Sequence, residues 1–229
     1  MSYDNVKADE LWSFEANKNA REIIITGTGD NEELYEESAF ENINFLSKFN
    51  LIKKTNTTLH IGCGNGRIEK HLAKLVKKCV GVDISTKMVE LANERCADLD
   101  NVEFIKGSGF ELTNIGDKTI DVAYSFFVFQ HIPRDCVEGY FKELSRVLKP
   151  NGKILCQFQL LGDMAIKTNR QEPQQDHPSD IRLYSIEAIE DLANRNGFSI
   201  INWGEKVQAE LDSKRRIFDC NIFPIFELK

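Results

Sequence analysis

Residues Thr58-Leu59-His60-Ile61-Gly62-Cys63-Gly64-Asn65-Gly66-Arg67 decide how the rest of this chain is organised. A short run that favours β-structure leads into three glycines at alternate positions, and a helical pattern follows at once. Glycine adopts positive φ angles readily and lets a ligand approach closely, because it has no Cβ. A strand, a glycine turn and a helix start together favour a nucleotide-like ligand over a tight βα turn that binds nothing.

The glycine spacing narrows the class of ligand. Dinucleotide folds carry G-x-G-x-x-G, whereas this chain reads G-x-G-x-G, and Arg67 stands where the third glycine would be. This spacing disfavours a nicotinamide oxidoreductase. A second apolar segment, 79–83, ends in Asp83, and an acid at the end of a second strand can accept both ribose hydroxyls. Ser85 and Thr86 compete with Asp83 for the alternative role of helix cap.

Four stretches in this order resemble the motifs of class I S-adenosylmethionine-dependent methyltransferases. Gly62–Gly66 and Gly81-Val82-Asp83-Ile84-Ser85 are similar to the first two motifs. Asp121–Ser125 with Phe129–Pro133, and the turn Lys149-Pro150-Asn151-Gly152 before a strand, fit the later ones. The resemblance runs from about residue 57 to residue 158.

The resemblance implies S-adenosylmethionine as the cofactor and S-adenosylhomocysteine as its product. By position, the implied cofactor-binding residues are Gly62, Cys63, Gly64, Asn65, Gly66, Arg67, Asp83, Ile84, Met88, Ser108, Gly109, Phe110, Ser125, Phe126 and Phe127. Among them Asp83 would accept the ribose hydroxyls, and Ile84 and Met88 would pack on the adenine.

Three further roles follow from the same comparison. Arg67 would reach the cofactor carboxylate, with a surface ion pair as an equally good alternative. Ser108 stands where the family often places an acid for the adenine amino group. Ser125, Phe126 and Phe127 would face the sulfur and the methyl group.

Composition limits the fold and the partners. The chain has 229 residues, 41% hydrophobic and 28% charged, which suits one soluble α/β domain. A net charge of −7 argues against nucleic acid or an anionic membrane as a partner. Without a membrane-spanning run or a signal peptide, the expected location is the cytoplasm. The six cysteines form no C-x-x-C pair, so they are expected to be reduced core thiols, and no metal site is expected.

The expected fold is α/β, a Rossmann-like sheet of seven mostly parallel strands with helices on both faces and a helical N-terminal extension. Strands are expected at 58–61, 78–82, 102–106, 120–126, 153–160 and 199–203, with a seventh inside 215–226. Helices are expected at 67–76, 86–96 and 135–148, after a cap at Ser185, and in two N-terminal segments, one of them capped by Asp30 or Asn31.

One domain, 1–229, is expected, in four parts. Residues 1–50 form a helical lid, 57–160 the cofactor-binding core, 161–184 a substrate loop and 185–229 a C-terminal helix with strands. Trp12, Tyr35 and Phe40 are the candidate lid residues, although they could equally dock the helices on the core. In and after the loop, cations are candidates for holding an anionic substrate, with plain solvation as the alternative: Lys167, Arg170, Arg182, Arg215 and Arg216.

Methyl transfer needs alignment and exclusion of water more than a catalytic dyad. His131 is the candidate general base for an alcohol or phenol, its alternative being a core histidine; His177 is a weaker second candidate. No Asn-Pro-Pro-Tyr run follows the fourth strand, so a small-molecule O or N acceptor is favoured. An RNA methyltransferase and a non-catalytic cofactor-binding protein remain alternatives, and a homodimer stays open.

Overall fold

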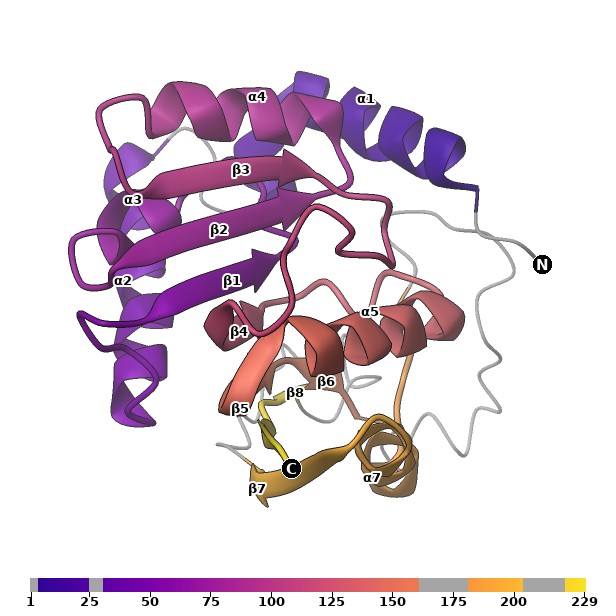
Figure 1. The fold of residues 1–229 in the computed structure, drawn as a ribbon. Coiled ribbons are helices and arrows are strands. Elements are labelled where there is room, and N and C mark those ends of the chain that lie inside the picture. The colour runs from indigo at the N-terminus through magenta and orange to yellow at the C-terminus, as the bar shows by residue number, and fades with distance from the viewer. Residues whose placement is uncertain (1–3, 25–30, 161–180, 204–220) are drawn as a thin grey trace, which may run out of the picture.

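A seven-stranded sheet forms the centre of the molecule (Figure 1), with strand order β3-β2-β1-β4-β5-β9-β7. The computed structural model describes residues 4–24, 31–160, 181–203 and 221–229. The five strands from β3 to β5 pair in parallel, whereas β9 pairs antiparallel with both β5 and β7. The predicted Rossmann-like fold of seven mostly parallel strands is therefore confirmed.

The parallel strands follow each other through helical crossovers, as the alternating pattern predicts. Their bounds are β1 Thr57–Ile61, β2 Lys78–Asp83, β3 Val102–Lys106, β4 Ile120–Ser125 and β5 Leu148–Cys156. The antiparallel edge consists of β7 Phe198–Asn202 and β9 Ile225–Leu228. A second small sheet pairs β6 Phe158–Gln159 with β8 Asn221–Ile222.

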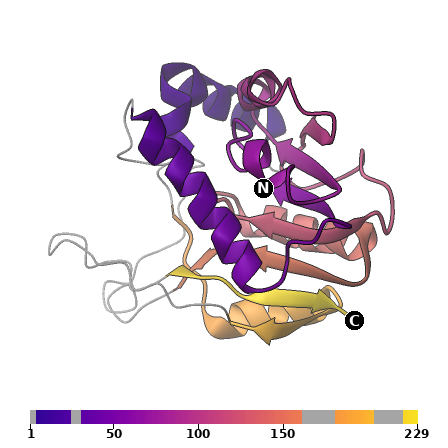
Figure 2. The ribbon, with the colours of Figure 1, turned by 90° about the vertical axis from the view of Figure 1, so that its left-hand side faces the viewer.

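Helices cover both faces of the sheet (Figures 1 and 2). On one face α2 (Glu32–Lys48) and α3 (Glu69–Leu72) share a core cluster with Tyr124 of β4. On the other face α5 (Arg134–Val147) and α7 (Ile186–Arg195) pack on the central strands. Helices α1 (Asn5–Ile24) and α4 (Thr86–Arg95) complete the fold. None of these described helices has the length and apolar character to span a membrane.

Side-chain caps begin three of these helices where the sequence predicts them. Asn31 accepts from the backbone N–H of Leu34 at 3.1 Å, Ser85 from that of Met88 at 3.1 Å, and Ser185 from that of Ala188 at 3.2 Å. Each cap satisfies an N–H that the helix itself leaves without a partner. Gly197, at φ +79°, follows α7 in the left-handed conformation that glycine favours.

The structure corrects three expected elements. The regular part of the helix after the glycines covers Glu69–Leu72 and not 67–76. Beyond it, the backbone N–H groups of Lys74 and Leu75 donate to carbonyl groups three residues back instead of four. Leu75, which follows the regular part of this helix, is 40% exposed. Strand β5 begins at Leu148, with an irregular register across the expected turn. The last strand lies at Ile225–Leu228, at the end of the stretch expected to hold it.

Hydrogen bonds join helix α1 to the start of α4. The Asp9 carboxylate accepts hydrogen bonds from the Thr86 backbone N–H at 2.8 Å and from the Thr86 hydroxyl at 2.9 Å. Its partial burial opposes ionisation, but the bonds from Thr86, Ser13 and Lys106 hold the pKa of Asp9 below its usual range. Ser13 also lies 3.0 Å from the hydroxyl of Ser85. These contacts place α1 over the carboxyl end of β2.

Aromatic rings fill the core between the sheet and α5. Phe141 is fully buried, and its ring centroid lies 5.1 Å from that of Phe226 and 5.7 Å from that of Phe198. This contact joins a helix to both antiparallel strands. The cluster therefore connects the C-terminal strands to the rest of the sheet.

We expect Phe141→Ala to lower the free energy of unfolding by about 3–5 kcal/mol, because it leaves a cavity at this junction. Chemical denaturation followed by circular dichroism measures the change. Phe14→Ala is the matched control: Phe14 is 58% exposed and its described ring contact is with Lys18. The control should cost no more than about 1 kcal/mol. Equal losses in the two variants would contradict the assignment of Phe141 to the core.

Candidate active site

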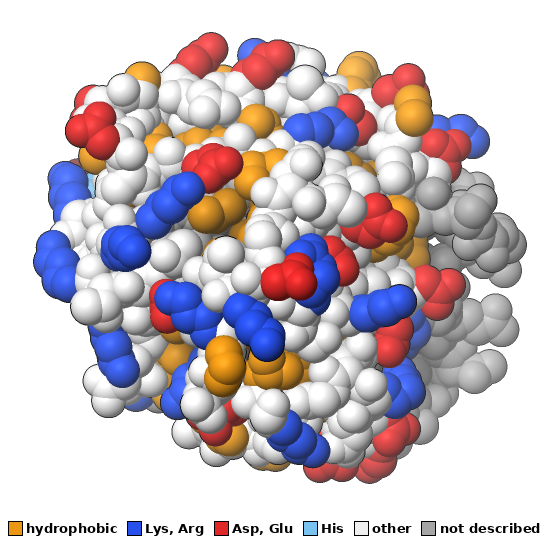
Figure 3. All heavy atoms as spheres, viewed as in Figure 1, with side chains coloured by type: hydrophobic (Ala, Val, Ile, Leu, Met, Phe, Trp, Pro, Cys, Tyr) orange, Lys and Arg blue, Asp and Glu red, His pale blue; other side chains and the backbone are white. Residues whose placement is uncertain are grey.

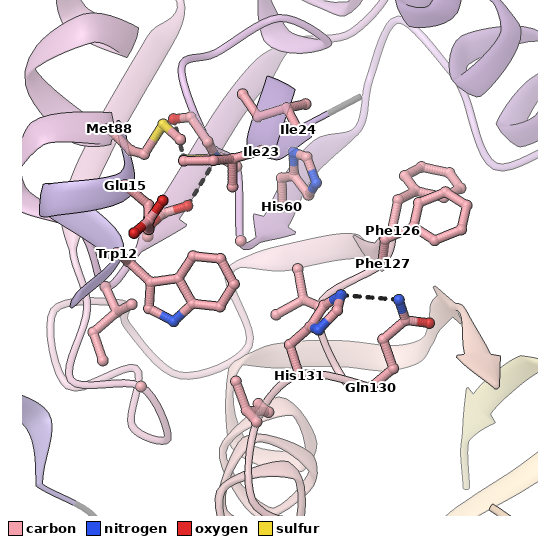
Figure 4. A pocket seen from close by; sticks show the side chains of 18 of the residues that line it. Trp12, Glu15, Ile23, Ile24, His60, Met88, Phe126, Phe127, Gln130 and His131 are labelled. Atoms are coloured by element: carbon pink, nitrogen blue, oxygen red, sulfur yellow. Dashed lines mark hydrogen bonds between the residues drawn. The ribbon is translucent and has the colours of Figure 1, made fainter. Parts of the chain in front are cut away.

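A cavity of about 710 Å³ lies at the carboxyl ends of β1, β2 and β4, with α1 on its outer side (Figure 4). Its volume falls in the range of ligand-binding pockets. Of the residues that the sequence singles out for a site, eleven line this cavity: Gly62, Cys63, Gly64, Arg67, Asp83, Ile84, Met88, Gly109, Phe126, Phe127 and His131. The topology thus brings together residues that lie far apart in the chain.

The glycine turn forms one wall of the cavity. Gly62 and Gly64 have φ of +74° and +54°, where a side chain would be strained. A Cβ on Gly62 would lie 2.2 Å from Val128, and one on Gly64 would lie 2.8 Å from Ile24 of α1. Gly66 does not line the cavity. A Cβ at this position would lie 2.9 Å from the ring of Phe104 in β3. Gly66 instead allows the chain to pack against β3.

Asp83 lies at the end of β2 on the cavity wall. One carboxylate oxygen accepts from the Gly64 backbone N–H at 2.8 Å and the other from the Ser85 backbone N–H at 2.9 Å. Burial raises the pKa of Asp83, while these two hydrogen bonds oppose the rise. Because Ser85 caps α4 with its own hydroxyl, Asp83 is not needed as the cap.

Arg67 is buried, so the alternative of a surface ion pair is wrong. Its guanidinium donates to Ser38 at 2.8 Å and to Asn42 at 2.9 Å, both on α2. Asn65 also faces α2, where it accepts a 2.9 Å bond from the buried hydroxyl of Tyr35. Asn65 and Tyr35 therefore join the glycine turn to α2 and do not line the cavity.

Three other predicted residues make contacts away from the cavity. The Ser108 hydroxyl accepts from the Glu111 backbone N–H at 3.0 Å and closes a local turn. The neighbouring Phe110 packs against the main core. Ser125 is buried and donates to the carbonyl of Ile61 at 2.9 Å, which joins β4 to β1.

His131 faces the cavity and belongs to a chain of amides (Figure 4). The side-chain amide of Gln157 donates to the side-chain oxygen Oε1 of Gln130 at 2.9 Å. This contact directs the side-chain nitrogen of Gln130 toward His131 Nε2, which lies 2.9 Å away. In this arrangement His131 Nε2 accepts a hydrogen bond, so the neutral ring carries its proton on Nδ1. The rings of Trp12 and His131 pack edge to face, with their centroids 6.1 Å apart.

Of the candidate lid residues, Trp12 lines the cavity, while Phe40 is half exposed and packs on His71. Arg182 is buried, and its backbone N–H donates to the Gln130 carbonyl at 2.7 Å. The remaining candidates of the loop and the C-terminal segment lie outside the described residues: Lys167, Arg170, His177, Arg215 and Arg216.

The sequence reasoning missed His60, which also lines the cavity. Its Nδ1 lies 2.7 Å from Glu69, and the hydroxyl of Tyr124 donates to the same carboxylate oxygen at 2.6 Å. A lone histidine inside a strand-like run gives no signal of this kind, because its partners are nine and 64 residues away. It also missed Glu15, Glu22, Ile23 and Ile24 of α1.

The cysteines behave as predicted where the structure describes them. Five cysteines are buried, as core residues are expected to be: Cys63, Cys79, Cys96, Cys136 and Cys156. Burial raises the pKa of Cys79 and of Cys96 to about 12, which keeps these thiols protonated. Within the described ranges, no group of three or more His, Cys, Asp or Glu side chains could hold a metal ion.

Residues 59–156 match a family described as a methyltransferase domain. A curated relative, demethylmenaquinone methyltransferase of Staphylococcus aureus, is 32% identical over 108 residues, covering 46% of this chain and 44% of the relative. The chain thus matches less than half the length of these relatives.

Solved structures share the fold over nearly the whole chain. Magnesium protoporphyrin IX methyltransferase of Synechocystis PCC 6803, with bound S-adenosylhomocysteine, superposes with a TM-score of 0.70 at 17% identity, covering 99% of this chain and 100% of that one. Phosphoethanolamine N-methyltransferase 1 of Haemonchus contortus gives 0.71 at 15% identity, covering 97% and 48%. Residues 59–156 thus match a methyltransferase domain, and the chain shares the fold of these two solved methyltransferases.

Proposed function

We propose that this protein transfers the methyl group of S-adenosylmethionine to an oxygen or nitrogen atom of a small molecule. The observation that carries the proposal is the single cavity with two different ends. One end has the glycine turn and Asp83, and the other has His131, Gln130 and Trp12. A cofactor and an acceptor bound at these ends would meet inside one cavity.

The residues at the first end fit the nucleoside of the cofactor. The Asp83 oxygens each accept one backbone N–H and keep further lone pairs for ribose hydroxyls. Ile84 and the buried Met88 offer an apolar surface for the adenine. The side-chain-free surface of Gly62 and Gly64 lets the backbone approach the ligand closely.

The middle of the cavity suits a positively charged sulfur. When bound, the cofactor supplies a methyl carbon activated by a sulfonium. The aromatic rings of Phe126, Phe127 and Trp12 line this cavity, and aromatic faces attract cations. A ligand that fills this cavity would displace water from it, which strengthens the electrostatic interactions inside.

The residues at the second end would orient the acceptor. Ile132, Tyr140 and Ile181 give this end an apolar lining, and His131 supplies an ionisable group. An acceptor with an apolar body and one hydroxyl or amino group fits this combination. If the acceptor keeps its proton near neutral pH, His131 would receive that proton at Nε2 as the methyl group transfers, which requires the Gln130 amide to turn away from this nitrogen.

Small molecules are favoured over RNA as acceptors by the surface charge. On the face in Figure 3, the lysine and arginine side chains of the described residues are interspersed with aspartate and glutamate. The chain as a whole carries a net charge of −7. RNA binding generally uses a basic patch or stripe. The relatives support the same choice, since their names refer to a quinone precursor, a porphyrin and phosphoethanolamine.

Asp83→Asn should weaken the binding of S-adenosylhomocysteine by roughly 10- to 100-fold, because a charged hydrogen-bond acceptor for the ribose is lost. Calorimetric titration measures the dissociation constant, with NADH titrated in parallel. Asp98→Asn serves as the control, since Asp98 is exposed and pairs with Lys70. An unchanged affinity in Asp83→Asn would remove Asp83 from the ribose site. Binding of NADH alone would refute the proposed cofactor.

His131→Ala should lower kcat by about 10²–10⁴-fold for an alcohol or phenol acceptor and leave S-adenosylhomocysteine binding within about threefold. Transfer of a labelled methyl group to a panel containing a quinol, a porphyrin carboxylate and a primary amine identifies the acceptor class first. His71→Ala is the matched control, because His71 contacts Glu36 and Phe40 away from the cavity. Full turnover by His131→Ala would exclude it as the base. Cofactor binding without transfer to any acceptor, RNA included, would favour the non-catalytic alternative.

A further inference from the structure

Phe127 has a backbone conformation that a bulky side chain disfavours. Its φ angle is +57°, in the left-handed region, where Cβ comes too close to a backbone carbonyl oxygen. Among the described residues, three other non-glycine residues have positive φ, and all three are exposed: Asn50, Lys118 and Asn151. Of these four residues, Phe127 alone is aromatic and lines the cavity. Strained residues of this kind concentrate at functional sites, so Phe127 is a candidate for a role in ligand binding.

The turn after β4 does not itself require a phenyl ring at this position. The turn brings Val128 against the glycine turn, since a Cβ added to Gly62 would lie 2.2 Å from Val128. It also leads to Gln130 and His131, which line the cavity. Glycine adopts positive φ without steric cost, so it would form the same turn more favourably than phenylalanine. The ring of Phe127 therefore has a role other than forming the turn.

The ring of Phe127 contributes less to the core than that of its neighbour. Phe126 is 8% exposed and packs among rings of β1, β4 and α2. Phe127 is 41% exposed, and its ring contact among the described residues is with the edge of Phe223, at 6.4 Å between centroids. Much of the Phe127 side chain is therefore accessible to a ligand.

The place of Phe127 in the sheet is on the acceptor side of the cavity. Phe127 follows β4, and β1 lies between β4 and the strand β2 that ends in Asp83. Neighbouring strands are about 4.8 Å apart, so two such spacings separate the end of β4 from the proposed ribose site. Figure 4 shows Phe127 across the cavity from Trp12 of α1. A ligand between these two residues would have an aromatic ring on each side.

We propose that Phe127 binds an aromatic ring of the methyl acceptor, with Trp12 on the other side of that ring. This inference rests on the proposed function and narrows its acceptor to a phenol or an aromatic amine. Pairs of aromatic rings gain energy from offset-stacked or edge-to-face packing, a gain that a saturated ring of similar size does not have. Phe127 is thus a specificity residue for the acceptor, and its strained backbone keeps the ring at the cavity wall before the ligand binds.

Titration with two probes of similar size tests the inference. One is 1-naphthol, and the other is decahydro-1-naphthol, which carries the same hydroxyl group on saturated rings. Each is titrated by calorimetry into protein saturated with S-adenosylhomocysteine. The native protein should bind 1-naphthol about 10-fold more tightly, and Phe127→Leu should reduce this preference by about 3- to 10-fold. Lys118→Leu, an exposed position with a φ of +53°, is the matched control and should keep the native preference.

A variant without the strain tests whether the ring serves the fold instead. Phe127→Gly relieves the strain of a positive φ but loses the contact with Phe223. Because these two effects oppose each other, we expect a Tm that is raised or at most about 4 °C below that of the native protein. Lys118→Gly relieves the same kind of strain outside the cavity and is the matched control. A larger loss of Tm in Phe127→Gly would make the ring a core residue and overturn its proposed role.

The outcomes separate this inference from the proposed function. Native protein that does not bind S-adenosylhomocysteine contradicts the proposed cofactor. Native protein that binds it, but binds 1-naphthol no more tightly than the saturated probe or not at all, overturns the aromatic acceptor site alone. This arm needs no variant to fold. A native preference for 1-naphthol that persists in Phe127→Leu would overturn the role of Phe127, because the preference would then come from other residues.

Discussion

The hydrogen bond from the Gly64 N–H to the Asp83 carboxylate is the interaction on which the cavity depends. It joins the glycine turn after β1 to the end of β2. The backbone N–H groups of Gly62 and Cys63 add bonds to the Val82 carbonyl at 2.8 and 3.1 Å. A turn with three residues at positive φ would otherwise be free to sample many conformations. These bonds hold the glycine surface in a fixed place beside the carboxylate.

The same carboxylate connects this turn to the helix that covers the cavity. The second oxygen of Asp83 accepts from Ser85, which caps α4 and touches Ser13 of α1. Asp9 of α1 then bonds to Thr86, in the first turn of α4. The position of Trp12 over the cavity is therefore set by the end of β2. Stability and ligand geometry depend on one short network.

The fold could be predicted because its signals are local. Glycine spacing, the caps at Asn31, Ser85 and Ser185 and the alternating apolar runs each act within a few residues. The glycine turn and Asp83 were predictable for the same reason, since parallel strands carry both to one edge of the sheet. Arg67, Asn65 and Ser125 show the limit of this reasoning. Their partners come from α2 and β1, and residue spacing does not show which way a side chain turns at a strand end.

His60 and Glu69 could not be predicted from the sequence. Burying a carboxylate costs several kcal/mol unless hydrogen bonds and an opposite charge compensate for it. Glu69 lies 2.7 Å from the His60 ring of β1 and accepts a hydrogen bond from Tyr124 of β4, and no local pattern predicts either contact. Buried ionisable groups of this kind concentrate at functional sites. The structure is needed to place His60 and Glu69 beside the cavity.

Part of the cavity lining lies outside the stretch that the family model matches. Residues 59–156 supply the glycine turn, Asp83, Phe126 and His131, while Trp12 of α1 and Ile181 add to the cavity lining from outside that range. Function on a common fold resides in such added walls. The proposed small-molecule acceptor would therefore be selected in part by the shape of the cavity beside Trp12 and Ile181.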